Sequence, residues 1–113
     1  MTDLTEAVRT QLEAARASAH GRDAQLVAHD GVLRQTVLAL TAGSELGEHN
    51  SPHAASLQVL TGRVRVTGLD ESEVAAGHLV VLTHERHAVL ALEDSVFLLT
   101  TVTSLDADQR TDG

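Results

Sequence analysis

The histidines of this chain are the residues whose type and spacing best suit chemistry. His49 and His53 lie four residues apart in a polar stretch, and neutral imidazole is the commonest metal ligand in proteins. Pro52 lies between them and disfavours a helix, which argues against the helical His-Glu-x-x-His arrangement of metalloproteases. On a straight strand the two residues would be about 13 Å apart, so they could share an ion only if residues 50–52 form a bend.

Two glycine–histidine patterns resemble the motifs of the cupin family. The first family motif reads Gly, five residues, His-x-His, three or four residues, Glu, six residues, Gly, and Gly43, His49 and Gly62 stand in register with it. The second is a glycine followed by a histidine that completes the metal site, matched by Gly77 and His87. The resemblance implies a jelly-roll β-barrel in which the two histidines, remote in the chain, meet in the barrel mouth.

The match covers about residues 32–102 and departs from the family at two ligand positions. Ser51 holds the position of the second histidine, and Ala55 holds that of the glutamate. If the chain bends at the proline, His53 can replace the ligand missing at position 51. The expected metal ligands are then His49, His53 and His87, with open positions for water or substrate.

Neutral nitrogen ligands suit transition metals better than Mg or Ca. We therefore expect a divalent transition metal (Zn, Ni, Fe, Cu or Mn) as cofactor. Two interpretations stay open for His49 and His87, which could instead be hydrogen-bonded histidines of the core or rim, and His53 could be an exposed loop residue. His84 and Gln58 are weaker ligand candidates, and no residue is assigned a catalytic role.

Two functions are compatible with these residues. The first is a metal-binding cupin, with an oxygenase- or isomerase-like reaction on a small organic molecule if it is an enzyme. The second is a metal-free cupin module that binds or senses a small molecule in an apolar cavity. The missing glutamate is the feature that keeps the second interpretation open.

Composition argues against nucleic acid and a membrane as partners, whereas a small-molecule ligand and a second copy of the chain are what the resemblance implies. The formal net charge of −8 disfavours a phosphate backbone, and Phe97 is the single aromatic residue, so nucleic-acid binding is not expected. There is no cysteine for a disulfide or a thiolate site. No signal peptide and no long apolar run is visible, so we expect a cytoplasmic protein without a membrane partner.

The hydrophobic pattern predicts an all-β fold with one N-terminal α-helix. A helix is expected over 3–18, where apolar residues recur at helical spacing and Asp3 can cap the first turn. About eight short strands are expected to follow, with turns at 43–47 and 84–86 and a loop at 68–72. Seven of them can be placed, and the pattern is typical of a closed antiparallel barrel: 25–29, 32–42, 55–60, 63–67, 78–83, 88–92 and 95–102.

The expected organisation is a helix at 1–22, a cupin barrel at 23–103 and a flexible tail at 104–113. The apolar stripe of the helix is narrow, so the helix needs a surface to lie on, either the barrel or a partner subunit. Single-domain cupins commonly pair through their outer sheet faces, and the resemblance therefore implies a homodimer.

Overall fold

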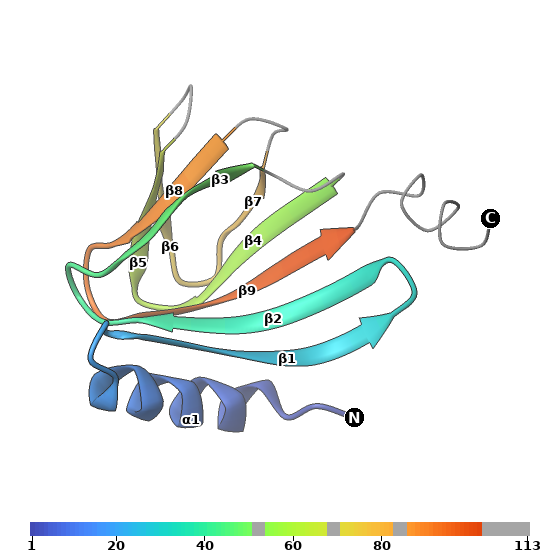
Figure 1. The fold of residues 1–113 in the computed structure, drawn as a ribbon, viewed down its shortest axis with the longest axis horizontal. Coiled ribbons are helices and arrows are strands. Elements are labelled where there is room, and N and C mark those ends of the chain that lie inside the picture. Colours follow the sequence, from blue (N-terminus) through green and yellow to red (C-terminus); the bar gives the residue numbers. More distant parts are fainter. Residues whose placement is uncertain (51–53, 68–70, 83–85, 103–113) are drawn as a thin grey trace.

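The computed structural model describes residues 1–50, 54–67, 71–82 and 86–102. Within these residues the chain forms one helix and nine strands, arranged as two antiparallel sheets that face each other (Figure 1). This confirms the predicted all-β jelly roll with one N-terminal helix. None of the helical structure in the described ranges is long and apolar enough to cross a membrane.

The two sheets differ in size. The five-stranded sheet has the order β1 (Arg22–Asp30), β2 (Leu33–Leu40), β9 (Ser95–Val102), β4 (Ala54–Thr61), β7 (Leu79–Leu82). The four-stranded sheet has the order β3 (Glu45–Asn50), β8 (Arg86–Ala91), β5 (Arg63–Thr67), β6 (Ser72–Ala75).

The main core lies between the sheets, and we call the sheet faces that line it the inner faces. Phe97, at 0% exposure, is its largest fully buried side chain, and it comes from the central strand of the five-stranded sheet. Alternate residues of β2, β4, β5 and β8 contribute to this core, as the period-two pattern requires. Its buried members are Leu38, Leu40, Ala55, Leu57, Val59, Val64, Val66, Val74, Leu82, Val89, Ala91 and Phe97.

The helix α1 (Leu4–Ala17) lies on the outer face of the five-stranded sheet, below β1 and β2 in Figure 1. Asp3 caps it by accepting a hydrogen bond from the backbone N–H of Glu6 at 3.1 Å, as the sequence predicted. The helix thus packs on its own barrel through a second, smaller core. That core contains Ala7, Ala15, Val37, Ala39 and Val96.

Most predicted elements are confirmed, including the strand at Arg63–Thr67, but two strands were missed. The turn expected at 43–47 gives way to β3 from Glu45, and the loop expected at 68–72 gives way to β6 from Ser72. Both are edge strands of the four-stranded sheet. Edge strands need less apolar sequence, so their hydrophobic signal is weak.

Two further predictions concern segments that lie partly or wholly outside the described residues. Arg86 begins β8, so it is a strand residue and not the end of a polar turn. The flexible tail predicted at 104–113 lies outside the described residues.

Candidate metal centre

The backbone register joins the two histidines that were expected to meet. His49 of β3 is the register partner of His87 of β8, while Leu46 pairs with Val89. Three steps along β3 (46 to 49) therefore match two along β8 (89 to 87), which marks a bulge with one extra residue. Regular alternation would place positions 46 and 49 on opposite faces, whereas the bulge places both on the inner face.

His87 is buried, at 7% exposure, and its ring is held by the backbone. Its Nδ1 lies 3.0 Å from the carbonyl oxygen of Thr67. A carbonyl oxygen only accepts, so Nδ1 donates this hydrogen bond. Metal-binding histidines are commonly oriented in this way, with one ring nitrogen donating to a carbonyl and the other available to the metal.

The complete ligand set extends beyond what the structure describes. Only the backbone of His49 is described, and His53, Ser51 and His84 lie outside the described residues. Among the described side chains, no group of three or more His, Asp or Glu is placed to hold a metal. The three-histidine set therefore stays a prediction. Two observations bear on it, namely the register pairing of His49 with His87 and the hydrogen bond that orients the ring of His87.

Ala55, at the position of the family glutamate, lies in β4 and is buried in the main core at 7% exposure. Its register partners are Leu82 in β7 and Thr101 in β9, neither of which is a carboxylate. Gln58 has the opposite alternation and pairs with Leu98, which packs on the helix side of the sheet. Gln58 thus belongs to the outer face, as its parity predicted.

Leu82, Ala55 and Thr101 form a row of register partners across the five-stranded sheet. This row continues through β2 and β1 to two basic residues. Thr101 pairs with Arg34 in β2, and Arg34 pairs with His29 in β1. Because Ala55 is on the inner face, its row-mates Arg34 and His29 occupy inner-face positions at the same end of the sheet. Alternation within 33–40 is the signal that could have found Arg34, since it shares parity with the buried leucines of its strand.

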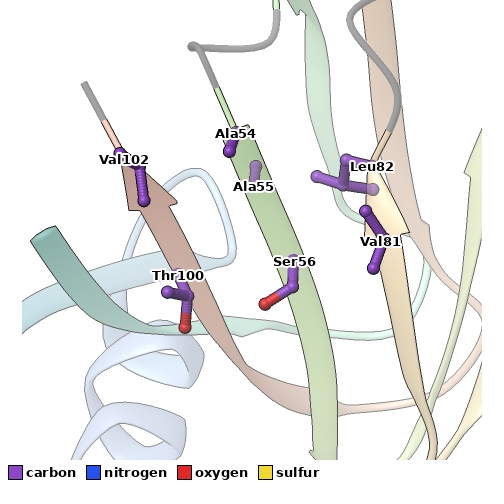
Figure 2. A pocket seen from close by; sticks show the side chains of 7 residues that line it. All are labelled: Ala54, Ala55, Ser56, Val81, Leu82, Thr100 and Val102. Carbon is purple, nitrogen blue, oxygen red and sulfur yellow. The ribbon is translucent and has the colours of Figure 1, made fainter. Parts of the chain in front are cut away.

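A hollow of about 430 Å³ opens at the same end of the five-stranded sheet, between β4, β7 and β9 (Figure 2). Ser56 and Thr100, which line it, are register partners, and their side chains alternate onto the outer face of the sheet. The hollow therefore does not belong to the barrel interior. It has no titratable side chain among its lining residues. These are Ala54, Ala55, Ser56, Val81, Leu82, Thr100 and Val102.

Solved structures share this fold. A conserved protein of unknown function from Streptococcus pyogenes is 28% identical, with a TM-score of 0.70 over 77% of this chain and 78% of its own. A cupin superfamily protein from Desulfitobacterium hafniense is 14% identical, with a TM-score of 0.69 over 74% of this chain and 78% of its own. A salicylate 1,2-dioxygenase from Pseudaminobacter salicylatoxidans is 16% identical, with a TM-score of 0.75 over 86% of this chain but 33% of its own.

No protein-family model matches the sequence, and no curated protein matches it. The two facing antiparallel sheets and the structural neighbours nevertheless agree with the two glycine–histidine motifs. This chain is therefore a small protein with the cupin jelly-roll fold.

Proposed function

We propose that this protein is a small cupin that binds a divalent transition metal through His49 and His87, with His53 as the third ligand. The observation that carries the proposal is the register pairing of His49 with His87 across β3 and β8. Paired residues of antiparallel strands share a face and lie close together, which is what two ligands of one ion require. The proposed cofactor is Zn, Ni, Fe, Cu or Mn.

The chemistry of the described donors fits such an ion. The hydrogen bond from His87 Nδ1 to the carbonyl of Thr67 orients the buried ring, and Nε2 would be the nitrogen that binds the metal in this proposal. With Ala55 in place of a carboxylate, the donors are neutral nitrogens, which suit transition metals better than Mg or Ca. When bound, the ion would act as a Lewis acid toward an oxygen ligand.

The barrel itself contributes an apolar wall. Leu57, at 0% exposure, and its register partner Leu99 lie on the inner face next to the Ala55–Thr101 pair. Such a wall would exclude water from a small organic molecule held near the histidines. A salicylate dioxygenase shares the fold, which supports an oxygenase-like reaction as one form of this function, with an isomerase-like reaction as the other.

A thermal-shift panel with Zn, Ni, Fe, Cu and Mn tests the proposal on untagged protein. A metal at about 100 times its Kd stabilises the folded state by about 2.7 kcal/mol. We expect this gain in the wild type and its loss in His87→Ala and His49→Ala. His78→Ala is the matched control, because His78 is exposed and precedes β7 away from the proposed ligands.

The His87→Ala protein is checked by circular dichroism, since the exchange also removes the hydrogen bond to Thr67. His87→Gln serves as a second variant that keeps a side-chain amide near that carbonyl. A wild-type protein that gains no stability from any of the five metals would overturn the proposal.

A second function is favoured by Ala55, which leaves an apolar residue where the family carries its carboxylate ligand. On this reading the barrel is a metal-free module that binds or senses a small molecule between its sheets. The same thermal-shift assay separates the two functions if a metabolite panel is run beside the metals. Stabilisation by a metabolite in metal-free protein, with none by metals, would favour the second function.

A further inference from the structure

Arg34 differs from the other arginines with described side chains in its position on the inner face and in its lack of a described acceptor. Arg34 belongs to β2 and is exposed, and it shares parity with Leu38 and Leu40, which are buried in the main core. The β2–β9 ladder is regular along its whole length, so nothing in the register changes this alternation. Position 34 therefore lies on the inner face of the five-stranded sheet, at the end of the strand where the core stops.

Within the described residues, Arg34 has no ion pair or hydrogen bond through its side chain. The other arginines with described side chains each contact an acceptor, either a carboxylate or a backbone oxygen. These pairs are Arg9 with Glu6 and Glu13, Arg16 with Asp94, Arg22 with the carbonyl of Glu45, and Arg63 and Arg65 with Glu73. Although the chain has a net charge of −8, none of the described carboxylates forms an ion pair with Arg34.

A histidine adjoins Arg34 because of a second bulge. The register of β1 with β2 shifts between Leu26 and Ala28, and His29 then becomes the partner of Arg34. Without the extra residue, regular alternation would put position 29 on the opposite face from its present one. The row at this end of the inner face thus carries two nitrogen-rich side chains next to Thr101 and Ala55.

This row lies on the sheet opposite the one that carries His49 and His87. Packed sheets are about 10 Å apart, so a small molecule between them can contact both. A guanidinium presents paired N–H donors that match the two oxygens of a carboxylate, and these charge-assisted hydrogen bonds are among the stronger ones in proteins. The chemistry of the row therefore selects for an organic anion.

We infer that the barrel binds a small organic carboxylate, whose carboxylate group is held by Arg34 with His29 as a neighbouring donor. The inference rests on the proposed function only in that the other end of the molecule would face the metal ligands. Arg34 acts here as a binding residue that sets the ligand class.

Isothermal titration calorimetry with matched pairs of probes tests this inference. Benzoate and malonate are titrated against their amides, benzamide and malonamide, at low ionic strength. We expect the carboxylates to bind at least about tenfold more tightly than the amides, which corresponds to about 1.4 kcal/mol. In Arg34→Gln the carboxylates should lose about that factor while amide binding is unchanged, and Arg34→Lys should be intermediate.

Arg9→Gln is the matched control, because Arg9 lies on α1 at the outer side and should leave carboxylate binding as in the wild type. Equal binding of acid and amide, or unchanged carboxylate binding in Arg34→Gln, would overturn the inference. Metal content is measured in parallel on every variant. If carboxylates bind to a protein that holds no metal and this binding depends on Arg34, the carboxylate site is supported and only the proposed metal site is contradicted.

Discussion

Ala55 is the residue at which this chain departs furthest from the cupin ligand pattern. It lies in the main core, with Leu57 two residues along the same strand and Leu82 as its register partner. A carboxylate in these surroundings loses its hydration and is costly unless a cation compensates it. The stability of a protein with a carboxylate at position 55 should therefore depend on whether a metal ion is bound nearby.

We expect Ala55→Glu to lower the melting temperature of metal-free protein and to enlarge the stabilisation that a bound metal gives. The first effect follows from burying a carboxylate, and the second from adding a charged ligand to the neutral histidines. Differential scanning calorimetry with and without Zn measures both. Ala54→Glu is the control, because Ala54 is exposed and of opposite parity, and a similar metal response in both variants would contradict the account.

Individual residues also show which parts of the candidate site could be predicted from the sequence and which could not. His49 and His87 were found from their motif spacing, and their register pairing agrees with that expectation. Arg34 belongs to no motif, and only its shared parity with Leu38 and Leu40 indicates that it lies on the inner face. The bulges that set the faces of His49 and His29 cannot be read from alternation, since an extra residue reverses the parity that alternation assumes.

At the scale of elements, tight connections hold the strands in the register on which the candidate site depends. Gly62 joins β4 to β5 with φ of 87°, a left-handed conformation that glycine adopts without strain. A side chain there would overlap the Ser95 hydroxyl and the backbone of Asp94. The Ser95 hydroxyl in turn accepts from Arg63 N at 2.9 Å, and its single hydrogen can be donated to the carbonyl of Glu93, at 2.7 Å, or of Arg63, at 3.0 Å.

Gly62→Ala should therefore destabilise the fold by more than the strain of a left-handed residue, which alone is about 1–2 kcal/mol. Gly31→Ala is the matched control, since Gly31 also has positive φ, of 58°, but no atom lies within 4 Å of its added methyl. Urea unfolding of both variants gives the comparison. Equal losses would show that the contact with Ser95 contributes nothing.

A second element-scale feature ties α1 to the sheet at Asp94, in the turn between β8 and β9. Its carboxylate accepts from the Ala42 N–H at 2.8 Å and from Arg16 at 2.9 Å. The Ala42 hydrogen bond, followed by Arg16, lowers the pKa of Asp94 below its ordinary value. A lowered folded-state pKa stabilises the fold above the unfolded-state pKa, and this stabilisation is lost as the pH falls through the folded-state pKa.

We expect Asp94→Asn to be less stable than the wild type near neutral pH and to approach it below about pH 4, where the unfolded-state carboxyl protonates. The free energy of unfolding, measured by urea titration from pH 7 downward, checks this. Because the pair is partly exposed, added salt should also narrow the gap at neutral pH. A difference that is independent of pH would contradict the assigned cause.

At the scale of the whole molecule, the jelly roll followed from strand-like segments, turn signals and two glycine–histidine motifs. The edge strands β3 and β6 did not follow, because their pairing comes from the neighbouring strand and not from their own apolar pattern. This matters for the site, since β3 carries His49. The motif singled out His49 as a candidate ligand, which stays a prediction, while the secondary-structure pattern missed the strand that carries it.

The homodimer stays a prediction, and the outer face beside β7 is where it can be tested. Val81 and Leu79 on this edge strand are 70% and 59% exposed, and Val81 lines the hollow shown in Figure 2. If copies pair through this face, Val81→Asp should shift the solution mass toward that of a monomer, because a charge would have to be buried in the contact. Light scattering coupled to size exclusion measures it, and a wild type that is already monomeric would refute the dimer.

The central claim is that histidines on β3 and β8 hold a metal in the barrel, and metal content tests it most directly. Protein purified without an affinity tag is analysed for transition metals by elemental mass spectrometry, as wild type and as His87→Ala, after both are equilibrated with Zn and desalted. We predict close to one metal per chain in the wild type and a near-complete loss in the variant. Equally low content in both proteins, or equally high content, would contradict the account.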